Sequence, residues 1–468
     1  MSNLNKVDFV TGMRRMVYAV TPNETSFKAV EEAPHYINEA TPFFWVCMVI
    51  ELAISVAKQD RKYRMSDAFT SISAGMFSRL PMVILRSITL EGYVWVYQNF
   101  RLTELPWDSQ WTWWLTFLGV DLAYYWFHRM AHEVNFMWAL HQTHHSSEDY
   151  NLSTALRQSV FQIYSSWVFY LPMALFIPPA VFIVHQELNI LYQFWIHTQY
   201  IRSLGPLEWI LNTPSHHRVH HGRNPYCIDK NYAGTLIIWD RLFGTFTAEK
   251  DTVAYGLTHP INTFEPFTIQ AGYIKYLLER LGSLRGLGNK ICNFLYGPGW
   301  LPGKPRLGNI EDIPKVESPV RKYDVRMPSW LSVYVFVHFM LFAGGYQELM
   351  ARKTTLSQTS VLVFVAYCFF NLTCFGRLFD GSKSAKIFEL VRCLMFVVGE
   401  TVLCQIGWFG ERGERPLAMV AFRWLFAASA SLWVALIMRA GNATEENAPM
   451  KPGTNLTKNR LDNKKKSN

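Results

Sequence analysis

The sequence lacks the cysteine pairs that mark a zinc ribbon or a disulfide-stabilised domain. Its 468 residues include seven cysteines, and no two of them form a Cys-x-x-Cys pair. Most of the seven lie inside apolar stretches, for example Cys47, Cys368 and Cys404. We therefore expect buried cysteines that pack as small apolar residues, and neither a disulfide framework nor a cysteine-ligated metal site.

The chain has little charge for its length, and long apolar stretches in its place. Charged residues make up 17% of the chain, hydrophobic residues 50% and aromatic residues 15%. A helix needs about 20 mostly apolar residues to cross a bilayer. Nine stretches meet or approach that length: Pro42–Ala57, Gly75–Tyr97, Trp111–Phe127, Val160–Val184, Leu188–Tyr200, Trp330–Tyr346, Val361–Phe375, Phe388–Trp408 and Leu417–Met438. The sequence thus predicts an all-α, multi-pass membrane bundle.

The excess of positive charge does not indicate a nucleic-acid partner. The net charge of +9 comes from loops and a basic tail that flank the apolar stretches, which is the distribution seen beside membrane spans. The first forty residues are polar and show no short apolar core before a cleavage site, so we expect no cleaved signal peptide. Membrane lipid is the expected partner.

The pattern divides the chain into five segments. They are a polar N-terminal segment (1–40), a membrane core (41–246), a cytosolic connecting region (247–327), a C-terminal transmembrane bundle (328–440) and a disordered basic tail (441–468). Lys465 and Lys466 match a dilysine retrieval signal, which predicts an endoplasmic-reticulum membrane protein with a cytosolic tail. Four spans before that tail place the connecting region and the end of the core in the cytosol. Arg14 and Arg15 conflict with the resulting lumenal N-terminus.

Histidines are concentrated in one part of the chain. Eleven of the fourteen lie between His128 and His221, and most of them form three boxes. The boxes are His128-x-x-x-His132, His141-x-x-His144-His145 and His217-x-x-His220-His221, the last preceded by His216, which we count as a doubtful member. Residues three or four apart share one face of a helix. We expect each box to present its imidazoles to a single point.

The number of imidazoles indicates more than one metal ion. About eight nitrogen ligands are too many for one tetrahedral zinc and suit two transition-metal ions with open positions. Imidazole suits iron, zinc and copper alike, so spacing does not identify the metal. A carboxylate-bridged centre needs Glu-x-x-His pairs, and only Glu32–His35 fits, with Pro34 inside it. A zinc protease is excluded because Phe136 stands where His132-Glu133 would require the second histidine.

Further polar residues near the boxes are candidates for the site. His197 follows an apolar stretch and is either a further ligand or a core residue. Asp121 lies seven residues before His128, where it could orient an imidazole, and we propose a catalytic role for it and for Glu133. Glu133 either serves a cofactor or faces water. His185 is either interfacial or a support to the site. Tyr273–Leu284 has a helical apolar period and is either an interfacial or a packed surface helix.

The three boxes in this order resemble the fatty acid hydroxylase and sterol desaturase superfamily over about residues 111–246. Within that superfamily the chain is similar to the alkylglycerol monooxygenase family. Three stretches carry this likeness: Pro214-Ser-His-His-Arg-Val-His-His-Gly-Arg-Asn224, Leu191-Tyr-Gln-Phe-Trp-Ile-His-Thr198 and Gly234-Thr-Leu-Ile-Ile-Trp-Asp-Arg-Leu-Phe-Gly-Thr-Phe246. The additional C-terminal apolar block extends the likeness to most of the chain.

The resemblance implies a di-iron site on the cytosolic face. It assigns the iron ligands to His128, His132, His141, His144, His145, His217, His220 and His221. It also implies dioxygen- and tetrahydrobiopterin-dependent cleavage of 1-O-alkylglycerols and lyso-ether lipids, with a pterin-regenerating reductase as partner. Hydroxylation of the carbon next to the ether oxygen would give a hemiacetal, which collapses to a fatty aldehyde and a glycerol derivative.

Two alternatives remain at this stage. A sterol or fatty-acyl hydroxylase or desaturase would take electrons from cytochrome b5. The chain has no His-Pro-Gly-Gly motif and therefore no fused b5 domain, but a separate b5 would leave no trace. A metal transporter or sensor should carry its ligands on broken helices near the midplane and often has internal repeats. The boxes lie instead at the ends of apolar stretches, and no repeat is found.

Overall fold

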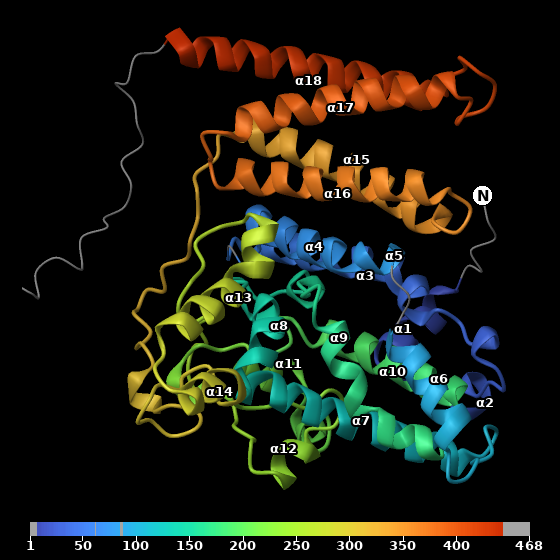
Figure 1. Cartoon of the computed structure of the whole chain (residues 1–468), viewed down its shortest axis with the longest axis vertical. Coiled ribbons are helices and arrows are strands. Elements are labelled where there is room, and N and C mark those ends of the chain that lie inside the picture. The colour runs from blue at the N-terminus through green and yellow to red at the C-terminus, as the bar shows by residue number, and fades with distance from the viewer. Residues whose placement is uncertain (1–6, 61, 85–87, 443–468) are drawn as a thin grey trace, which may run out of the picture. The chain divides into compact units, whose positions relative to one another are not determined.

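The computed structural model describes residues 7–60, 62–84 and 88–442. Within these ranges the secondary structure is helical, apart from two isolated β-bridges, Leu211–Leu236 and Gly222–Tyr255 (Figure 1). The predicted all-α class is confirmed. The basic tail and its dilysine pair lie outside the described residues.

Eight α-helices precede residue 146 in the described part of the chain, and the last two of them carry the first two histidine boxes. They are α1 (Phe9–Met16), α2 (Pro22–Thr25), α3 (Tyr36–Lys58), α4 (Met65–Arg79), α5 (Pro81–Ile84), α6 (Ile88–Phe100), α7 (Gln110–Glu133) and α8 (Asn135–His145). The remaining helices are α9 (Ile163–Ser166), α10 (Pro179–Trp195), α11 (Pro214–His220), α12 (Ile238–Leu242), α13 (Pro266–Ser283), α14 (Leu287–Leu295), α15 (Ser329–Arg352), α16 (Gln358–Phe379), α17 (Ala385–Gln405) and α18 (Leu417–Asn442).

Local sequence explains where the helices around the site begin. Proline occupies the first position of α10, α11 and α13, where its missing N–H costs no hydrogen bond. Glu265 caps α13 by accepting from the backbone N–H groups of Phe267 and Thr268. Val134 is extended and is the only residue between α7 and α8. This tight turn sets the first two histidine boxes against each other.

Four helices are long and apolar enough to cross a membrane. They are residues Val30–Lys58, Ser329–Arg352, Gln358–Phe379 and Leu417–Arg439, and they contain four of the nine predicted stretches. The chain is therefore a multi-pass membrane protein, as predicted. The apolar stretches 75–97 and 160–184 do not form single long helices, because the described residues of each are divided among several shorter helices. The predicted spans within α7, α10 and α17 are helical but are not among the four candidates.

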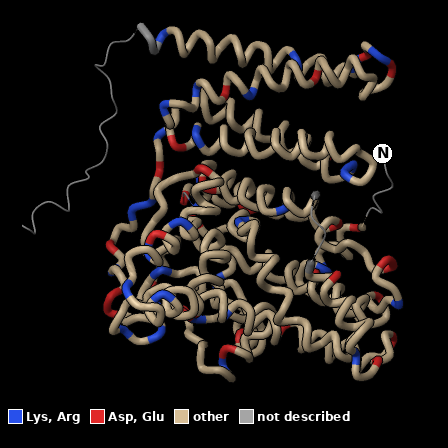
Figure 2. Tube along the Cα trace, in the orientation of Figure 1, with Lys and Arg blue, Asp and Glu red and all other residues tan. Residues whose placement is uncertain are grey.

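The described contacts divide the chain into two compact units, Met1–Ser382 and Lys383–Asn468. The division lies between α16 and α17, whereas the predicted segment boundary at residue 328 remains a prediction. In the second unit, α17 and α18 run side by side (Figure 1). Glu400 on α17 pairs with Arg415 at 2.7 Å and with Arg423 at 2.6 Å. Elsewhere the charged residues gather mainly at helix ends and in loops (Figure 2).

Helix α13 is the helix expected near Tyr273–Leu284. It packs against α8 and α4 and buries Ile269, Gln270 and Leu277. The structure therefore shows a helix packed on the core. Its contact with α8 supports the second histidine box, since Gln142 and Thr143 both donate to the carbonyl of Ile269.

Candidate metal centre

Nine histidines from four helices meet in the interior of the first unit. The end of α7 contributes His128 and His132, and α8 contributes His141, His144 and His145. His197 follows the end of α10, and His217, His220 and His221 lie on or directly after α11. All nine side chains are buried. The prediction that left His197 open as a ligand or a core residue therefore finds it among the box histidines.

The nine imidazoles form two groups. Group A consists of His128, His132, His141, His145 and His220, and group B consists of His144, His197, His217 and His221. Within each group the candidate ligand atoms all lie within 4.8 Å of one another. Each group could hold a metal ion.

The expectation that each box serves a single point is wrong for two of the three boxes. His141 and His145 lie in group A, but His144 between them lies in group B. On α11, His217 and His221 lie in group B, whereas His220 lies in group A. Neighbouring residues of a helix point about 100° apart, so residues four apart stay together and the residue just before the second one faces away.

Hydrogen bonds to the protein fix the protonated nitrogen of several rings. Four main-chain carbonyls accept from Nδ1 atoms at 2.7–3.0 Å: Tyr232 from His128, Arg157 from His144, Gln193 from His197 and Lys230 from His220. A carbonyl oxygen only accepts, so each Nδ1 carries the proton. Each Nε2 therefore presents a lone pair, and this arrangement orients metal-binding imidazoles in proteins.

These lone pairs point at one another. His144 Nε2 and His197 Nε2 lie 3.3 Å apart, and neither carries a proton to share. His128 Nε2 lies 3.1 Å from His141 Nε2. Two nitrogens bound at about 2.1 Å to one ion are about 3.0 Å apart at a right angle and about 3.4 Å apart in a tetrahedron. A cation between the rings would account for spacings that are otherwise repulsive.

Buried histidine nitrogens without hydrogen-bond partners, and lowered histidine pKa values, also indicate bound cations. The Nε2 atoms of His132 and His220 are buried and have no hydrogen-bond partner, which is costly unless another group uses the lone pair. Burial lowers the pKa of His141 and of His197 to about 4. The rings are therefore neutral near pH 7, the form in which imidazole binds metals. The residues present fit metal ions.

Two of the eleven histidines between His128 and His221 stay outside both groups. The His216 ring lies 5.4 Å from the ring of Phe246, and its carbonyl accepts from Asn231. The Nδ1 of His185 lies 2.7 Å from the hydroxyl of Tyr18, and its ring packs against Trp113. His185 thus joins the N-terminal segment to α10, and the doubt about His216 is justified.

Asp121 binds the backbone that follows the third box. Its fully buried carboxylate accepts from the N–H groups of Thr235 at 2.7 Å and Leu236 at 2.9 Å, and from the side chains of Asn189 and Trp239. The prediction that it orients an imidazole is corrected, because both oxygens are used by these donors. The side of α7 that carries Asp121 faces residues 235–239.

Glu133 is buried and paired, so the alternative that it faces water is wrong. Its carboxylate accepts from Arg129 at 2.8 Å and pairs with Arg306, which also donates to the Glu133 carbonyl. Burial, and then the nearby charge of Glu133, raise the pKa of Asp229 to about 7. Glu133 directly follows His132 in the chain, and two arginines hold its side chain.

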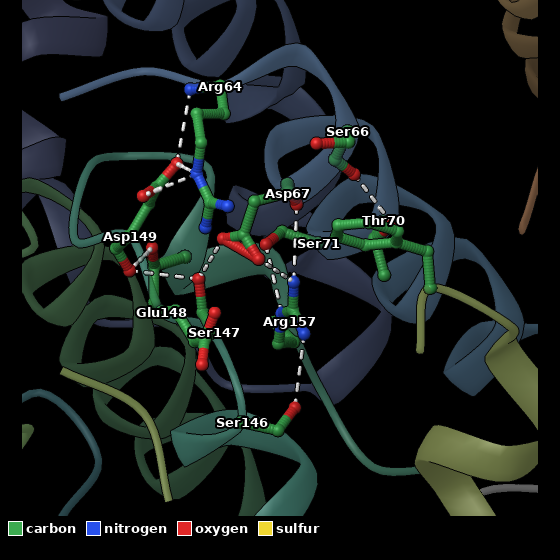
Figure 3. Close-up of polar contacts among 12 residues, drawn as sticks. Arg64, Ser66, Asp67, Thr70, Ser71, Ser146, Ser147, Glu148, Asp149 and Arg157 are labelled. Carbon is green, nitrogen blue, oxygen red and sulfur yellow. Dashed lines mark hydrogen bonds and ion pairs between the residues drawn. The ribbon is translucent and has the colours of Figure 1, made fainter. Parts of the chain in front are cut away.

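Sequence reasoning missed Arg157, whose carbonyl orients His144. Its guanidinium is 2% exposed and donates to Asp67 at 2.7 Å, to Ser71 at 3.0 Å and to Ser146 at 3.1 Å (Figure 3). Asp67 and Ser71 lie on α4, so this ion pair ties α4 to group B. The available signal was that Arg157 is the only residue from 150 to 186 that carries a permanent charge.

Glu51 was missed as well, although it is the only charged residue between Pro42 and Ala57. It is buried on α3, and its carboxylate accepts from the Thr198 hydroxyl at 2.6 Å and from the Leu152 N–H at 2.7 Å. Thr198 directly follows His197. The first candidate span is therefore hydrogen-bonded to group B, and an acidic residue within an apolar stretch was the signal.

Two tyrosines border the groups. The Tyr150 ring stacks on His197 at 5.6 Å and on Tyr255 at 4.8 Å, which covers group B. Tyr232 lies beside group A, with its ring 5.4 Å from that of His132 and its buried hydroxyl without a hydrogen-bond partner.

Comparisons with known proteins give two family matches and several close relatives. The family described as fatty acid hydroxylase matches residues 113–245, and the alkylglycerol monooxygenase C-terminal domain matches residues 331–411. The chain is 56% identical to an alkylglycerol monooxygenase from Homo sapiens, over 83% of this chain and 87% of that protein. The corresponding values for the Xenopus tropicalis protein of that name are 55%, 84% and 88%, and for the Caenorhabditis elegans protein 37%, 82% and 80%. No solved structure matches the chain.

Proposed function

Because this chain belongs to the alkylglycerol monooxygenase family, we propose that groups A and B each hold an iron ion and that tetrahydrobiopterin supplies the electrons. The chain is a membrane-bound monooxygenase that cleaves the ether bond of alkylglycerols. Membership of this family removes the alternative of a metal transporter or sensor. Two irons fit the number and type of ligands, since nine neutral imidazoles in two sets leave coordination positions open.

The reaction is balanced with one reductant. One atom of dioxygen becomes a hydroxyl on the carbon next to the ether oxygen, and the other leaves as water after two electrons and two protons are supplied. The hydroxylated carbon is a hemiacetal, and its collapse breaks the carbon–oxygen bond to the glycerol. The products are a fatty aldehyde and a glycerol derivative. When bound, the iron ions supply the dioxygen chemistry.

The residues of the chain position the ligands and exclude water. The carbonyls of Arg157, Gln193, Tyr232 and Lys230 hold their imidazoles in one tautomer. The nine histidines are buried, so competing water is kept from the site. Glu133 and Asp121 are the proposed catalytic residues from sequence. The contacts of Asp121 support a positioning role for it. Glu133 directly follows His132, where it could contact a cofactor.

The choice of electron donor rests on family membership. A pterin-regenerating reductase is then the expected partner, and cytochrome b5 is the donor under the alternative of a sterol or fatty-acyl hydroxylase. We also propose the endoplasmic reticulum as the location, with the histidine groups and the C-terminal tail on the cytosolic side. The four candidate spans support the membrane part of this proposal.

The observation that carries the proposal is that the imidazole lone pairs of the nine histidines converge in two separate sets, groups A and B. The test is aldehyde release from a labelled alkylglycerol by membranes containing the chain, with and without tetrahydrobiopterin, beside a His145→Ala variant. We expect pterin-dependent product that the variant does not form. Oxidation of sterol or acyl substrates with reduced cytochrome b5, and no product with pterin, would overturn the proposed donor and substrate.

A further inference from the structure

Four large apolar side chains protrude together beside the third histidine box. Leu207, Trp209, Ile210 and Leu242, here called the apolar knob, are 55%, 70%, 58% and 68% exposed. Scattered apolar residues are normal on a protein surface, but a contiguous group that includes an exposed indole marks a surface with a partner. We therefore expect a partner to cover these four side chains.

The knob is built as one rigid piece from two segments. Leu207 and Trp209 belong to a 3₁₀ turn (Gly205–Trp209), and Leu242 ends α12. The β-bridge between Leu211 and Leu236 joins the segments, and Arg241 donates to the carbonyl of Glu208 at 3.1 Å. The Arg241 guanidinium also lies 5.0 Å from the centroid of the Trp209 ring. The exposure of the knob is thus held in place by the fold.

Its composition fits the boundary between lipid chains and headgroups. Tryptophan collects at that boundary because its ring is apolar and its N–H is polar. Arg241 lies against Trp209, and the exposed Arg202 lies a few residues before the 3₁₀ turn. Arginine beside exposed indole and leucine side chains suits an anionic phospholipid surface.

The knob adjoins α7. Phe243 follows Leu242, and its ring lies 5.0 Å from Trp126 and 5.3 Å from Tyr125, both on α7. Toward its N-terminus α7 exposes Trp111, Trp114 and Leu118, which lie on one helical face. Ring contacts of Phe243 therefore join the knob to α7, the helix that bears the first histidine box and exposes apolar side chains near its N-terminus.

The knob also connects directly to the metal groups. Only Leu211, Asn212 and Thr213 separate Ile210 from α11, which carries the third box. Asn212 donates from its backbone N–H to the Thr235 carbonyl at 2.8 Å and from its side chain to the Ala233 carbonyl at 2.6 Å. Fixing the knob in a lipid surface would therefore also fix the position of α11, because the connection between them is short and hydrogen-bonded.

We propose that the apolar knob is an anchor for the lipid surface, with Trp209 at headgroup level and the exposed Arg202 facing anionic headgroups. The anchor would hold α11 at the depth where a lipid's polar head meets its chain. That is the depth of an ether carbon, and this second part rests on the proposed function. The occupant is the lipid surface itself.

The contact with lipid is tested without turnover. A fluorophore that responds to polarity is attached to a Leu242→Cys variant of the full chain, with the partly exposed Cys47 and Cys292 replaced by alanine. The protein is placed in phosphatidylcholine vesicles with and without phosphatidylserine and with spin-labelled lipid. We expect blue-shifted emission, quenching by the spin label and stronger quenching with phosphatidylserine. The same label at the exposed Asp251 is the control and should remain in water.

A label at Leu242 that stays water-exposed in these vesicles overturns the proposal, as does one shielded only by a second copy of the chain or by another protein. If the label is quenched but the wild-type protein forms no aldehyde with pterin, the anchor stands and the proposed function fails. If aldehyde forms and the label is not quenched, the function stands and the anchor fails. The two results are therefore separable.

A kinetic experiment tests the link to the substrate. A Trp209→Ala, Leu242→Ala double variant should raise the KM for a long-chain alkylglycerol in vesicles about tenfold and leave kcat and metal content unchanged, because lipid contact is weakened while the site is intact. The matched control is Trp95→Ala on α6, an indole of 58% exposure outside the knob. Equal KM values for both variants and the wild type would refute the link.

Discussion

Group A and group B use the same ligand type but are held in different ways. Group B takes its four rings from α8, α10 and α11, and it is covered by Tyr150 and braced by the buried Arg157–Asp67 pair and by Glu51. Group A takes five rings from α7, α8 and α11, and the ring and the carbonyl of Tyr232 adjoin it. The two groups therefore differ in their supports: residues of α3 and α4 brace group B, whereas the segment that contains Tyr232 supports group A.

Substitution of the adjacent residues His144 and His145 gives the sharpest test of the division into two groups. His144→Ala should deplete the metal of group B and His145→Ala that of group A, and each should lower activity at least a hundredfold, since even supporting residues are worth about 10–100-fold. Metal per chain and activity are measured on the purified protein. His216→Ala is the control and should keep both. Each variant should therefore lose one ion per chain, and loss of both ions or of neither in either variant would contradict two distinct groups.

The Arg157–Asp67 pair should matter for group B alone. Asp67→Asn leaves a buried guanidinium without its counter-charge, which costs about 3–5 kcal/mol of stability, and it should weaken metal binding at group B about 10–100-fold. Thermal inactivation and metal titration give the two values. An Asp67→Leu, Arg157→Met double variant removes both charges and should recover part of the lost stability. Equal weakening at group A would contradict this assignment.

Gly234 tests the support of group A. A Cβ at this position would lie 2.8 Å from an Asn189 oxygen and 2.9 Å from an Asp121 oxygen. Gly234→Ala should therefore displace the 232–236 segment, whose Tyr232 carbonyl orients His128, at a cost of about 1–3 kcal/mol. Gly272→Ala on α13 has nothing within 4 Å and should be neutral or stabilising. Stability and metal content at group A are compared between the two variants.

A further test concerns pH dependence near Glu133. Asp229 has a raised pKa of about 7 in the folded state, so it binds a proton more tightly there than in the unfolded state. Its contribution to stability is present below about pH 4, falls as the pH rises to about 7 and is then lost. Asp229→Asn should flatten thermal stability between those values. Exposed Asp251→Asn is the control, and an unchanged slope in the Asp229 variant would contradict the shift.

The helical class and the eight box histidines of the site were predictable from sequence, because both rest on local spacing. Long apolar stretches have few structural alternatives, and histidines three or four apart must share a helix face. His197 stood alone in the sequence, so its place in group B depends on how α10 packs against α8 and α11. The sorting of His144 and His220 into opposite groups follows from helix geometry, but it could be seen only once the facing helices were placed.

The supporting residues could not be assigned in the same way. Asp121 shares a helix face with His128, yet its partners are more than 60 positions away along the chain, in α10 and residues 235–239. Arg157 acts through its carbonyl, which no side-chain pattern reveals. The division of residues 75–97 and 160–184 into short helices has a local cause, because Pro81 and Pro179 each begin a new helix inside an apolar stretch.

Helices α8 and α11 each give rings to both groups, and this has a consequence for how the centre is assembled. An ion that binds first in either group fixes both helices and so organises half of the other site in advance. An ion in either group should therefore favour binding in the other without being required for it, so the second ion should bind more tightly than the first when the wild-type chain is titrated with metal.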